Sequence, residues 1–164
     1  MDIRPARPED ASEVTRLREL LFDAYGLQRA GGWQETCEHV FRQGLATRQM
    51  AAFVADDPER PGRLVSAGVG IVVQRLSAPG NPSGRGGHIQ SMYTEERARG
   101  QGAGRAILEG LVDWFRSRGI PHIELSATPE AEPLYRRYGF VDKPWGRPLQ
   151  LRVEGLPGTR PDRC

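Results

Sequence analysis

The sequence predicts an α+β domain in which helices pack on a partly antiparallel sheet. Three observations support this class. The chain has 164 residues, which is the size of one domain. Segments with the two-residue period of strands and the 3.6-residue period of helices follow one another in the mixed order β-α-α-β-β-β-α-β-α-β-β. Glycine (20 residues) and proline (13 residues) separate these segments as turn signals, yet they are too few for a low-complexity chain.

The first half of the chain is expected to contain a short strand, two helices and two longer strands. Residues 1–7 suit a strand, and Pro8, Glu9 and Asp10 then begin a helix whose positive end the two acids stabilise. Apolar side chains recur at helical spacing after them, and Gly26 ends the helix. The elements that follow are a glycine-containing loop over 28–33, a helix over 34–48, a strand over 50–55, a turn with two prolines over 56–62, and a valine-rich strand over 63–74.

The second half is expected to contain the most regular helix of the chain. A loop with four glycines and two prolines over 77–87 precedes a strand over 88–94. In the segment 103–118 the apolar residues share one helix face, and Gly119 and Pro121 mark its end. The remaining elements are a strand over 122–127, a short helix over 133–138, and weaker strands over 140–141 and 149–153. Residues 1–153 then form one domain, and residues 154–164 form a disordered tail.

Composition and charge exclude several classes of protein. The net charge is only +2, because 21 acids offset 23 bases, and no basic cluster exceeds two adjacent residues, so we expect no nucleic-acid binding. All bases except Lys143 are arginines, which suit anion recognition but also follow from codon bias. Cys37 and Cys164 form neither a disulfide framework nor a zinc site. Without a secretory signal or an apolar run of 18 residues, the chain is expected to be cytoplasmic, with no membrane span and no metal.

The sharpest motif is the glycine turn Arg99–Arg105, which reads R-G-Q-G-A-G-R between a predicted strand and the strongest helix. Glycines at alternate positions let the backbone approach a ligand closely. The helix start presents unpaired N–H groups and a positive dipole end, which favour a phosphate or pyrophosphate. The turn lacks the lysine of a P-loop and the third glycine of a Rossmann fingerprint. Taken alone, a purely structural turn is the simpler interpretation.

The motifs around this turn resemble those of the GNAT superfamily of acyl-CoA-dependent N-acetyltransferases. The pyrophosphate loop of that superfamily reads R/Q-x-x-G-x-G/A, and residues 99–104 fit every fixed position. Three further stretches resemble the superfamily: M-Y-T-E-E-R at 92–97, L-Y-R-R-Y-G-F at 134–140 and the opening I-R-P-A-R-P-E-D-A. The resemblance covers roughly residues 1–153. It implies a three-layer α/β/α fold, with a mixed, largely antiparallel sheet of about six or seven strands, a V-shaped splay and about four flanking helices.

The resemblance implies an N-acetyltransferase that moves the acetyl group of acetyl-CoA to a primary amine by direct attack, without a metal. It assigns the strand end to the pantetheine arm and thioester, and the glycine turn to the pyrophosphate. The residues so assigned are Met92, Tyr93 and Thr94 for the arm, and Arg99, Gly100, Gln101, Gly102, Ala103 and Gly104 for the pyrophosphate. A non-catalytic acyl-CoA-binding or regulatory domain that kept the loop is the alternative.

The resemblance also implies two catalytic residues. Tyr135 matches the tyrosine that faces the leaving sulfur, so we expect it to act as general acid. Glu124 lies between apolar strand residues, where some members use a glutamate to deprotonate the amine through water. A structural tyrosine and a solvated carboxylate are the plain alternatives, and His88 or water could replace Glu124 as base. The usual asparagine after this strand is replaced by A-T-P-E at 127–130, where Thr128 could supply a contact.

The acceptor is expected to be a small-molecule amine or an amine of a protein or peptide. Its site should lie between the first pair of helices and the 77–87 loop, where acids and aromatic rings would suit a cationic amine. The candidate wall residues are Asp23, Tyr25, Trp33, Glu35, Glu38 and Gln90, each of which could instead be helix surface or core. Homodimers are common in the superfamily, so the resemblance leaves a homodimer open.

Overall fold

The computed structural model describes residues 1–27 and 31–143, which belong to two compact units. The first unit is Met1–Ser126, and the second begins at Ala127. No helix within the described ranges is long and apolar enough to cross a membrane.

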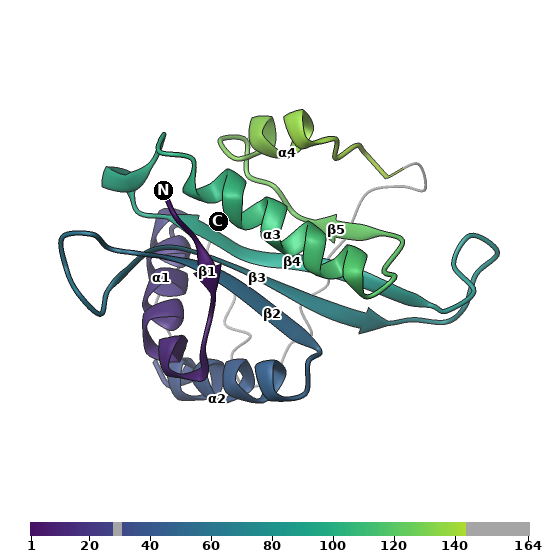
Figure 1. Cartoon of the computed structure of the whole chain (residues 1–164), viewed down its shortest axis with the longest axis horizontal. Coiled ribbons are helices and arrows are strands. Elements are labelled where there is room, and N and C mark those ends of the chain that lie inside the picture. The colour runs from purple at the N-terminus through teal and green to yellow at the C-terminus, as the bar shows by residue number, and fades with distance from the viewer. Residues whose placement is uncertain (28–30, 144–164) are drawn as a thin grey trace. The chain divides into compact units, whose positions relative to one another are not determined.

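The first unit contains a five-stranded sheet with the strands in chain order (Figure 1). The strands are β1 (Arg4–Pro5), β2 (Met50–Asp56), β3 (Leu64–Gln74), β4 (Arg85–Thr94) and β5 (Ile123–Leu125). Neighbours from β1 to β4 are antiparallel, and only β5 runs parallel to its neighbour β4. The expected mixed, largely antiparallel sheet is therefore confirmed, with five strands in the described ranges rather than six or seven.

The missing strands have two separate explanations. Residues 140–141 form no strand, because the Phe140 N–H donates to the Tyr135 carbonyl at 3.0 Å and so closes the end of a helix. The strand expected over 149–153 and the tail over 154–164 lie outside the described residues.

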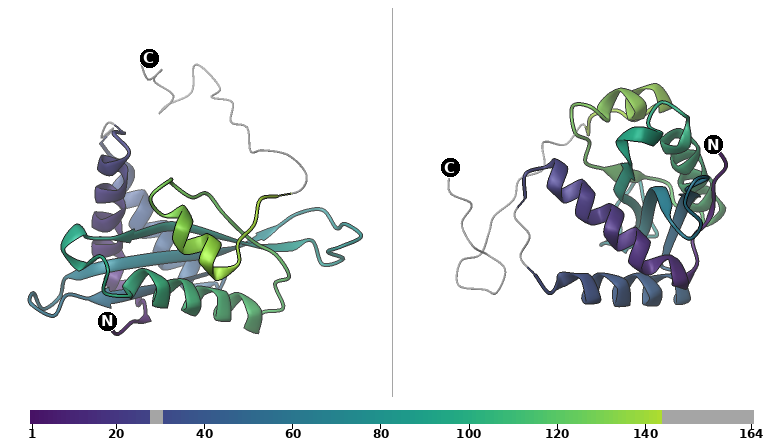
Figure 2. Two further views of the ribbon diagram at one scale, coloured as in Figure 1. Left: turned by 90° about the horizontal axis from the view of Figure 1, so that it is seen from above. Right: turned by 90° about the vertical axis from the view of Figure 1, so that its left-hand side faces the viewer.

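Helices cover both faces of this sheet, as the end-on view in Figure 2 shows. On one face lie α1 (Ala11–Ala24), which follows a 3₁₀ turn at Pro8–Asp10, and α2 (Trp33–Ala46). On the other face lies α3 (Ala103–Ser117), which follows a 3₁₀ turn at Glu96–Ala98. This layering agrees with the predicted three-layer arrangement, and the observed bounds differ from the predicted ones by only a few residues.

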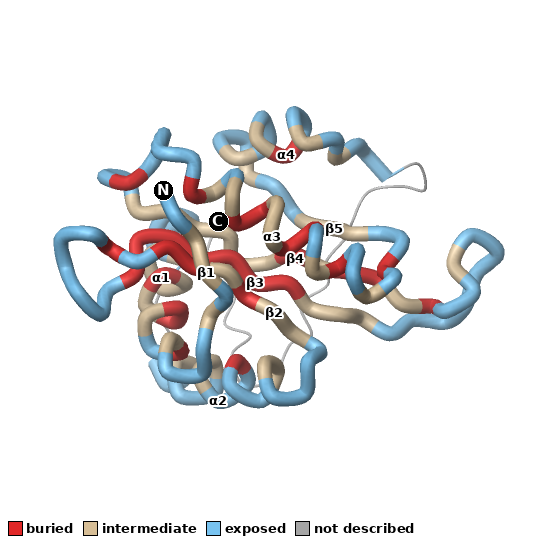
Figure 3. The backbone as a smooth tube through the Cα atoms, viewed as in Figure 1, coloured by how far each residue is buried: buried red, intermediate tan, exposed pale blue. Residues whose placement is uncertain are grey.

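Burial follows the layers, so that the sheet is covered along its middle (Figure 3). Toward α1 and α2 the core contains Ala11, Val14, Leu17, Phe41, Ala52, Val54, Leu64, Ala67 and Val69. Toward α3 the sheet has glycines where the helix side chains are large. A Cβ at Gly87 or at Gly70 would lie 2.8 or 2.9 Å from the nearest atom of the Phe115 ring, which is completely buried. These glycines therefore let α3 pack close to β3 and β4.

The same contacts fix which side of β4 faces which layer. Gly87 faces α3, and neighbouring strand residues point to opposite faces, so His88 lies on the side of α1 and α2.

The second unit contains α4 (Glu132–Tyr138), close to the predicted 133–138. The helix ends at Gly139, whose φ of +114° needs a residue without a Cβ. Tyr135 is the buried residue of this helix, and its ring packs edge-on to Phe140 with 5.9 Å between centroids.

Candidate active site

Strand β4 has a neighbour along its whole length on one edge but along only part of the other. On the β3 side, pairing continues as far as Thr94, which is opposite Ser66. On the β5 side, pairing is confined to three pairs and ends where Ile89 meets Leu125. Among the described residues, no strand pairs with the second edge of β4 beyond Ile89. That edge is available to an extended ligand that adds as a strand.

A β-bulge lies at the start of this open stretch. Ala67 is opposite Tyr93 and Val69 is opposite Gln90, so two β4 residues, Ser91 and Met92, share one position on β3. Ser91 has a φ of +56°, a conformation that a residue with a side chain adopts only at a cost. Such strain is typical of functional sites, and the bulge turns the backbone of β4 just beyond its last pair with β5.

A glycine on β3 accommodates the bulge. A Cβ at Gly68 would lie 2.3 Å from the sulfur of Met92 and 2.6 Å from Cγ2 of Ile107 in α3. Only a glycine therefore leaves room for Met92 under α3. Gly68 and Gly70 interrupt a valine-rich strand, and glycine within a strand signals a bulge or a close approach, so Gly68 was the sequence signal that could have revealed this site.

Arg18 of α1 reaches the bulge from the opposite layer. Its Nη1 donates to the Ser91 hydroxyl, and its guanidinium carbon lies 4.7 Å from the centre of the Phe22 ring. Phe22 in turn packs edge-on against Trp33, with 5.5 Å between centroids. Trp33 was a predicted wall residue, whereas Arg18, Phe22 and Ser91 were missed. Helical periodicity marks Arg18 as surface and Phe22 as core, so nothing in the sequence joined them to β4.

The other predicted wall residues lie on or next to α1, α2 and β4. Glu38 pairs with Arg42 one helical turn away, at 2.7 Å. Asp23, Tyr25 and Glu35 are exposed, and Gln90 lies half-buried on β4 beside the bulge.

Hydrogen bonds join the end of β4 to the glycine turn. The Thr94 hydroxyl lies 2.7 Å from the Ser66 hydroxyl, and Ser66 also donates to the Tyr93 carbonyl at 3.0 Å. Arg99 donates from Nε to the Thr94 carbonyl at 3.1 Å, and its guanidinium carbon lies 5.9 Å from the centre of the Tyr93 ring. Met92, Tyr93, Thr94 and Arg99, all predicted ligand residues, are thus parts of one continuous stretch.

The glycine turn forms an open cradle at the start of α3. Gly100 and Gly102 have φ angles of +75° and +85°, and a Cβ at either would have no atom within 4 Å. Gly102 precedes the helix, whose first turn contains no acidic residue and whose cap makes no side-chain hydrogen bond. The first N–H groups of α3 and the positive end of its dipole are therefore open to an anion, and Arg99, about half exposed (53%), adds positive charge beside them.

Ion pairs fix the turn that leads into this cradle. Glu95 accepts from Arg16 of α1 at 2.8 Å and from Arg97 at 2.9 Å, and Arg97 also pairs with Asp57. The Asp57 side chain is completely buried, and burial alone would raise its pKa. The hydrogen bonds from Arg97 and from the Glu59 N–H, together with the charges of Arg97 and Arg60, outweigh burial and lower the pKa. Arg97 is therefore bound to carboxylates of the scaffold.

Glu124 and His88 are brought together, but Glu124 is not an isolated carboxylate. The two residues are register partners on β5 and β4 and share the face of α1 and α2. Both oxygens of Glu124 accept from Arg75, each at 2.9 Å, while 23% of its side chain stays exposed. The hydrogen bond to Glu124 raises the pKa of Arg75. This bidentate pair joins β5 to the end of the β3–β4 hairpin.

The remaining predicted residues belong to the second unit. Tyr135 is buried in α4, and the Thr128 hydroxyl accepts the Ala131 N–H at 3.3 Å at the start of that helix. Thr128 therefore has a local role in the turn before α4.

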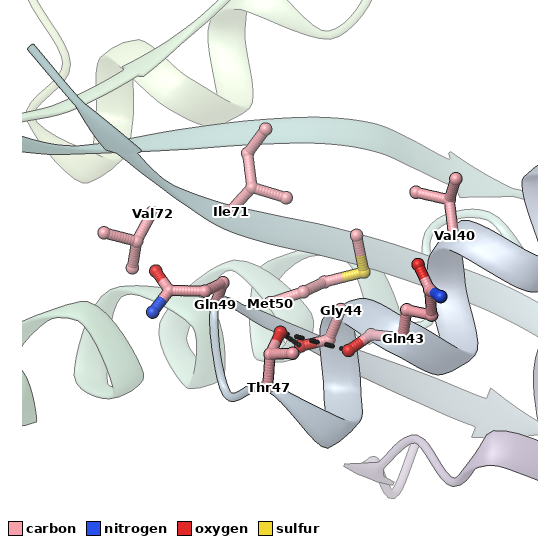
Figure 4. A pocket seen from close by; sticks show the side chains of 8 residues that line it. All are labelled: Val40, Gln43, Gly44, Thr47, Gln49, Met50, Ile71 and Val72. Atoms are coloured by element: carbon pink, nitrogen blue, oxygen red, sulfur yellow. Dashed lines mark hydrogen bonds between the residues drawn. The ribbon is translucent and has the colours of Figure 1, made fainter.

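One hollow of the described surface offers no acid–base chemistry, and the described residues offer no metal-binding cluster. This shallow hollow, beside α2, contains no titratable side chain (Figure 4). It is lined by Val40, Gln43, Gly44, Thr47, Gln49, Met50, Ile71 and Val72. Within the described ranges, no group of three or more His, Cys, Asp or Glu residues could hold a metal ion.

Comparison with known proteins gives one consistent answer. Residues 14–140 match the Acetyltransferase (GNAT) family. Glucosamine 6-phosphate N-acetyltransferase 1 of Oryza sativa subsp. japonica is 34% identical over 112 residues, which cover 65% of this chain and 65% of that protein. A second rice protein, probable glucosamine 6-phosphate N-acetyltransferase 2, is 32% identical over a stretch that covers 55% of this chain and 53% of that protein. The chain thus spans less than two thirds of the length of these relatives.

Solved structures share the fold. A predicted acetyltransferase from Clostridium acetobutylicum, solved with acetyl-CoA, has a TM-score of 0.81 and 25% identity over 91% of this chain and 95% of that one. Glucosamine-6-phosphate N-acetyltransferase from Arabidopsis thaliana has a TM-score of 0.70 and 18% identity over 91% of this chain and 97% of that one.

The open cradle leads to a prediction about Gly102. Alanine at this position should cost about 1 kcal/mol of stability, because its φ of +85° is left-handed. The new methyl group would also stand in the cradle, so we expect CoA to bind about tenfold more weakly in isothermal titration calorimetry. Gly119→Ala is the matched control, since Gly119 has a φ of +63°, equally open surroundings and a place at the opposite end of α3. Equal CoA affinity in both variants would remove Gly102 from the site.

Proposed function

The chain belongs to the Acetyltransferase (GNAT) family, and we propose that it is an acetyl-CoA-dependent N-acetyltransferase of a small-molecule primary amine. In this reaction a nitrogen–carbon bond forms, the carbon–sulfur bond of the thioester breaks, the amine loses a proton and the sulfur gains one. The observation that carries the proposal is the continuity of three features: the open edge of β4, the bulge at Ser91 and the glycine cradle before α3.

The chain's own residues fit acetyl-CoA, which supplies the activated acetyl group. Backbone groups of Met92, Tyr93 and Thr94 on the open edge would pair with the extended pantetheine arm. The cradle Arg99–Gly104 would hold the pyrophosphate through the helix N–H groups, the dipole and the Arg99 guanidinium. A backbone N–H at the bulge would stabilise the charge that develops on the thioester oxygen.

Tyr135 is proposed as the general acid that protonates the leaving sulfur. Its match to the L-Y-x-x-x-G-F motif supports this role, as does its position as the buried residue of α4. A phenol can donate this proton without a metal.

Glu124 is proposed as the base that removes the amine proton, directly or through water. Its position on the face of α1 and α2, beside His88, supports this role. The bidentate pair with Arg75 means that an incoming ammonium competes with an arginine for the same oxygens. His88 and water stay as the other candidates for this step.

The names of the plant relatives suggest which acceptor to try first. Both rice proteins are named for acetylation of glucosamine 6-phosphate, a small amine. An amine panel should therefore contain this sugar phosphate, free amino acids, polyamines and a lysine peptide.

The function is tested by binding and by turnover. At a concentration of about 100 Kd, acetyl-CoA should raise the Tm by about 5 °C or more, because it binds only the folded chain. One amine of the panel should release free CoA thiol, measured with a thiol reagent. Absence of any Tm shift at millimolar acetyl-CoA would refute the proposal, and a shift without turnover would favour a non-catalytic acyl-CoA-binding domain.

Tyr135→Phe tests the general acid. We expect kcat to fall about 100-fold, while KM for acetyl-CoA stays near the wild-type value, because only proton donation is removed. Tyr138→Phe removes a phenol hydroxyl from the same helix and serves as the control. An unchanged kcat in Tyr135→Phe would exclude Tyr135 as the acid.

Glu124→Gln tests the base through the pH dependence of kcat at saturating acceptor. In the wild type kcat should decline as pH falls, since a protonated carboxylate cannot accept the amine proton. In the variant kcat should be about 100-fold lower and should lose that decline. Glu109→Gln, on the solvent side of α3, should keep the wild-type profile. Superimposable profiles for wild type and Glu124→Gln would assign the step to His88 or water.

A further inference from the structure

Arg18 is a half-buried cation placed at the bulge of β4. Its Nη1 donates to the Ser91 hydroxyl, and its guanidinium lies 4.7 Å from the centre of the Phe22 ring. Ser91 has the strained φ of +56° and lies two residues beyond Ile89, the last β4 residue that pairs with β5. The guanidinium therefore lies on the α1 side of the strand, at the point where the proposed thioester site begins.

Arg18 differs from the arginines around it in what it contacts. Arg16, two residues earlier in α1, is shared between Glu13 at 2.9 Å and Glu95 at 2.8 Å. Arg75 is bidentate to Glu124. In the part of the chain that the structure describes, the partners of Arg18 are a hydroxyl and an aromatic ring, and no carboxylate pairs with it. One hydroxyl satisfies one of five guanidinium N–H donors, which leaves the rest for a ligand.

The energetics of this arrangement favour an anionic ligand. A guanidinium that is partly withdrawn from water loses hydration, and a hydroxyl and a π-face restore only part of that loss. A phosphate or a carboxylate would compensate the remaining loss of hydration, because two parallel N–H donors of the guanidinium match two oxygens of the anion. The Phe22 ring, itself packed against Trp33, limits the orientations of the planar group and so presents it ready for binding.

We infer that Arg18 binds an anionic group of the acceptor, so that the substrate is a primary amine that also carries a phosphate or a carboxylate. The inference rests on the proposed function for the presence of an acceptor at β4. It names a specificity-determining residue and excludes purely cationic acceptors such as polyamines, whose ammonium groups Arg18 would repel.

Anion binding is measured without turnover. The protein is first saturated with CoA, so that the glycine cradle is filled, and is then titrated with inorganic phosphate or with acetate in a calorimeter. Arg18→Gln should weaken binding of the preferred anion about 10- to 100-fold, the value of lost charge-assisted hydrogen bonds. Arg116→Gln removes the same charge from the exposed face of α3 and should leave binding unchanged. The anion that binds with the higher affinity shows whether the acceptor carries a phosphate or a carboxylate.

Selectivity in turnover is the second readout. The ratio of kcat/KM for glucosamine 6-phosphate to that for glucosamine should exceed about 10 in the wild type and approach 1 in Arg18→Gln. If another amine is the better acceptor, the same ratio is taken between an amino acid and its amide. Should Arg18→Gln fail to fold, Arg18→Lys keeps the charge without the fork and should give an intermediate loss.

The outcomes separate the two proposals. A protein that binds no CoA overturns the proposed function, while the difference between wild type and Arg18→Gln in phosphate or acetate affinity still reports on Arg18. Equal affinity of the two proteins for both anions overturns the inference, even if acetyl transfer is observed.

Discussion

The arrangement of the molecule depends on a strand that, among residues 1–27 and 31–143, is paired along the whole of one edge and along only part of the other. Strand β4 pairs with β3 as far as Thr94 but pairs with β5 only as far as Ile89. An isolated open edge would invite aggregation, so its persistence in a folded domain requires a reason. Here the bulge at Ser91 turns the strand at the point of separation, and Gly68 makes room for the displaced Met92 under α3. The sheet, the bulge and α3 therefore depend on one another in packing, and the glycine cradle follows the end of β4.

Six arginines around the sheet of the first unit differ in their partners. Arg4, Arg16, Arg75 and Arg97 are bound to carboxylates, which keeps the net charge small and ties the N-terminal strand, α1 and the hairpin to the sheet. Such partly buried, multiply bonded networks hold geometry more firmly than isolated surface pairs do. Arg18 instead contacts a hydroxyl and an aromatic ring, while Arg99 donates to a carbonyl, lies against the Tyr93 ring and has Glu96 at 3.7 Å. The scaffold and the proposed ligand site thus use the same type of side chain with different partners.

Local signals predicted most of the fold and the cradle, and long-range contacts account for what they missed. The stripe of α3 and the glycines at 100 and 102 are properties of short segments, so their structure could be predicted from the residues themselves. The Phe140 backbone was expected to extend but returns to Tyr135, because Gly139 permits a left-handed helix end. The contact of Arg18 with Ser91 joins residues 73 positions apart, and the pair of Arg75 with Glu124 joins residues 49 apart. No periodicity within one element contains such pairs.

These long-range contacts bear directly on how an acceptor amine would be treated. An ammonium that arrives beside Arg18 meets a like charge, which disfavours its protonated form and so favours the neutral nucleophile that the reaction needs. The same repulsion also opposes binding, unless the acceptor brings an anion that occupies the guanidinium. An acceptor with its own phosphate or carboxylate removes the repulsion, whereas a bare amine retains it together with competition from Arg75 for Glu124. With the proposed acceptor site at the bulge, electrostatics would therefore separate the two acceptor classes before any contact with the sugar or carbon skeleton contributes.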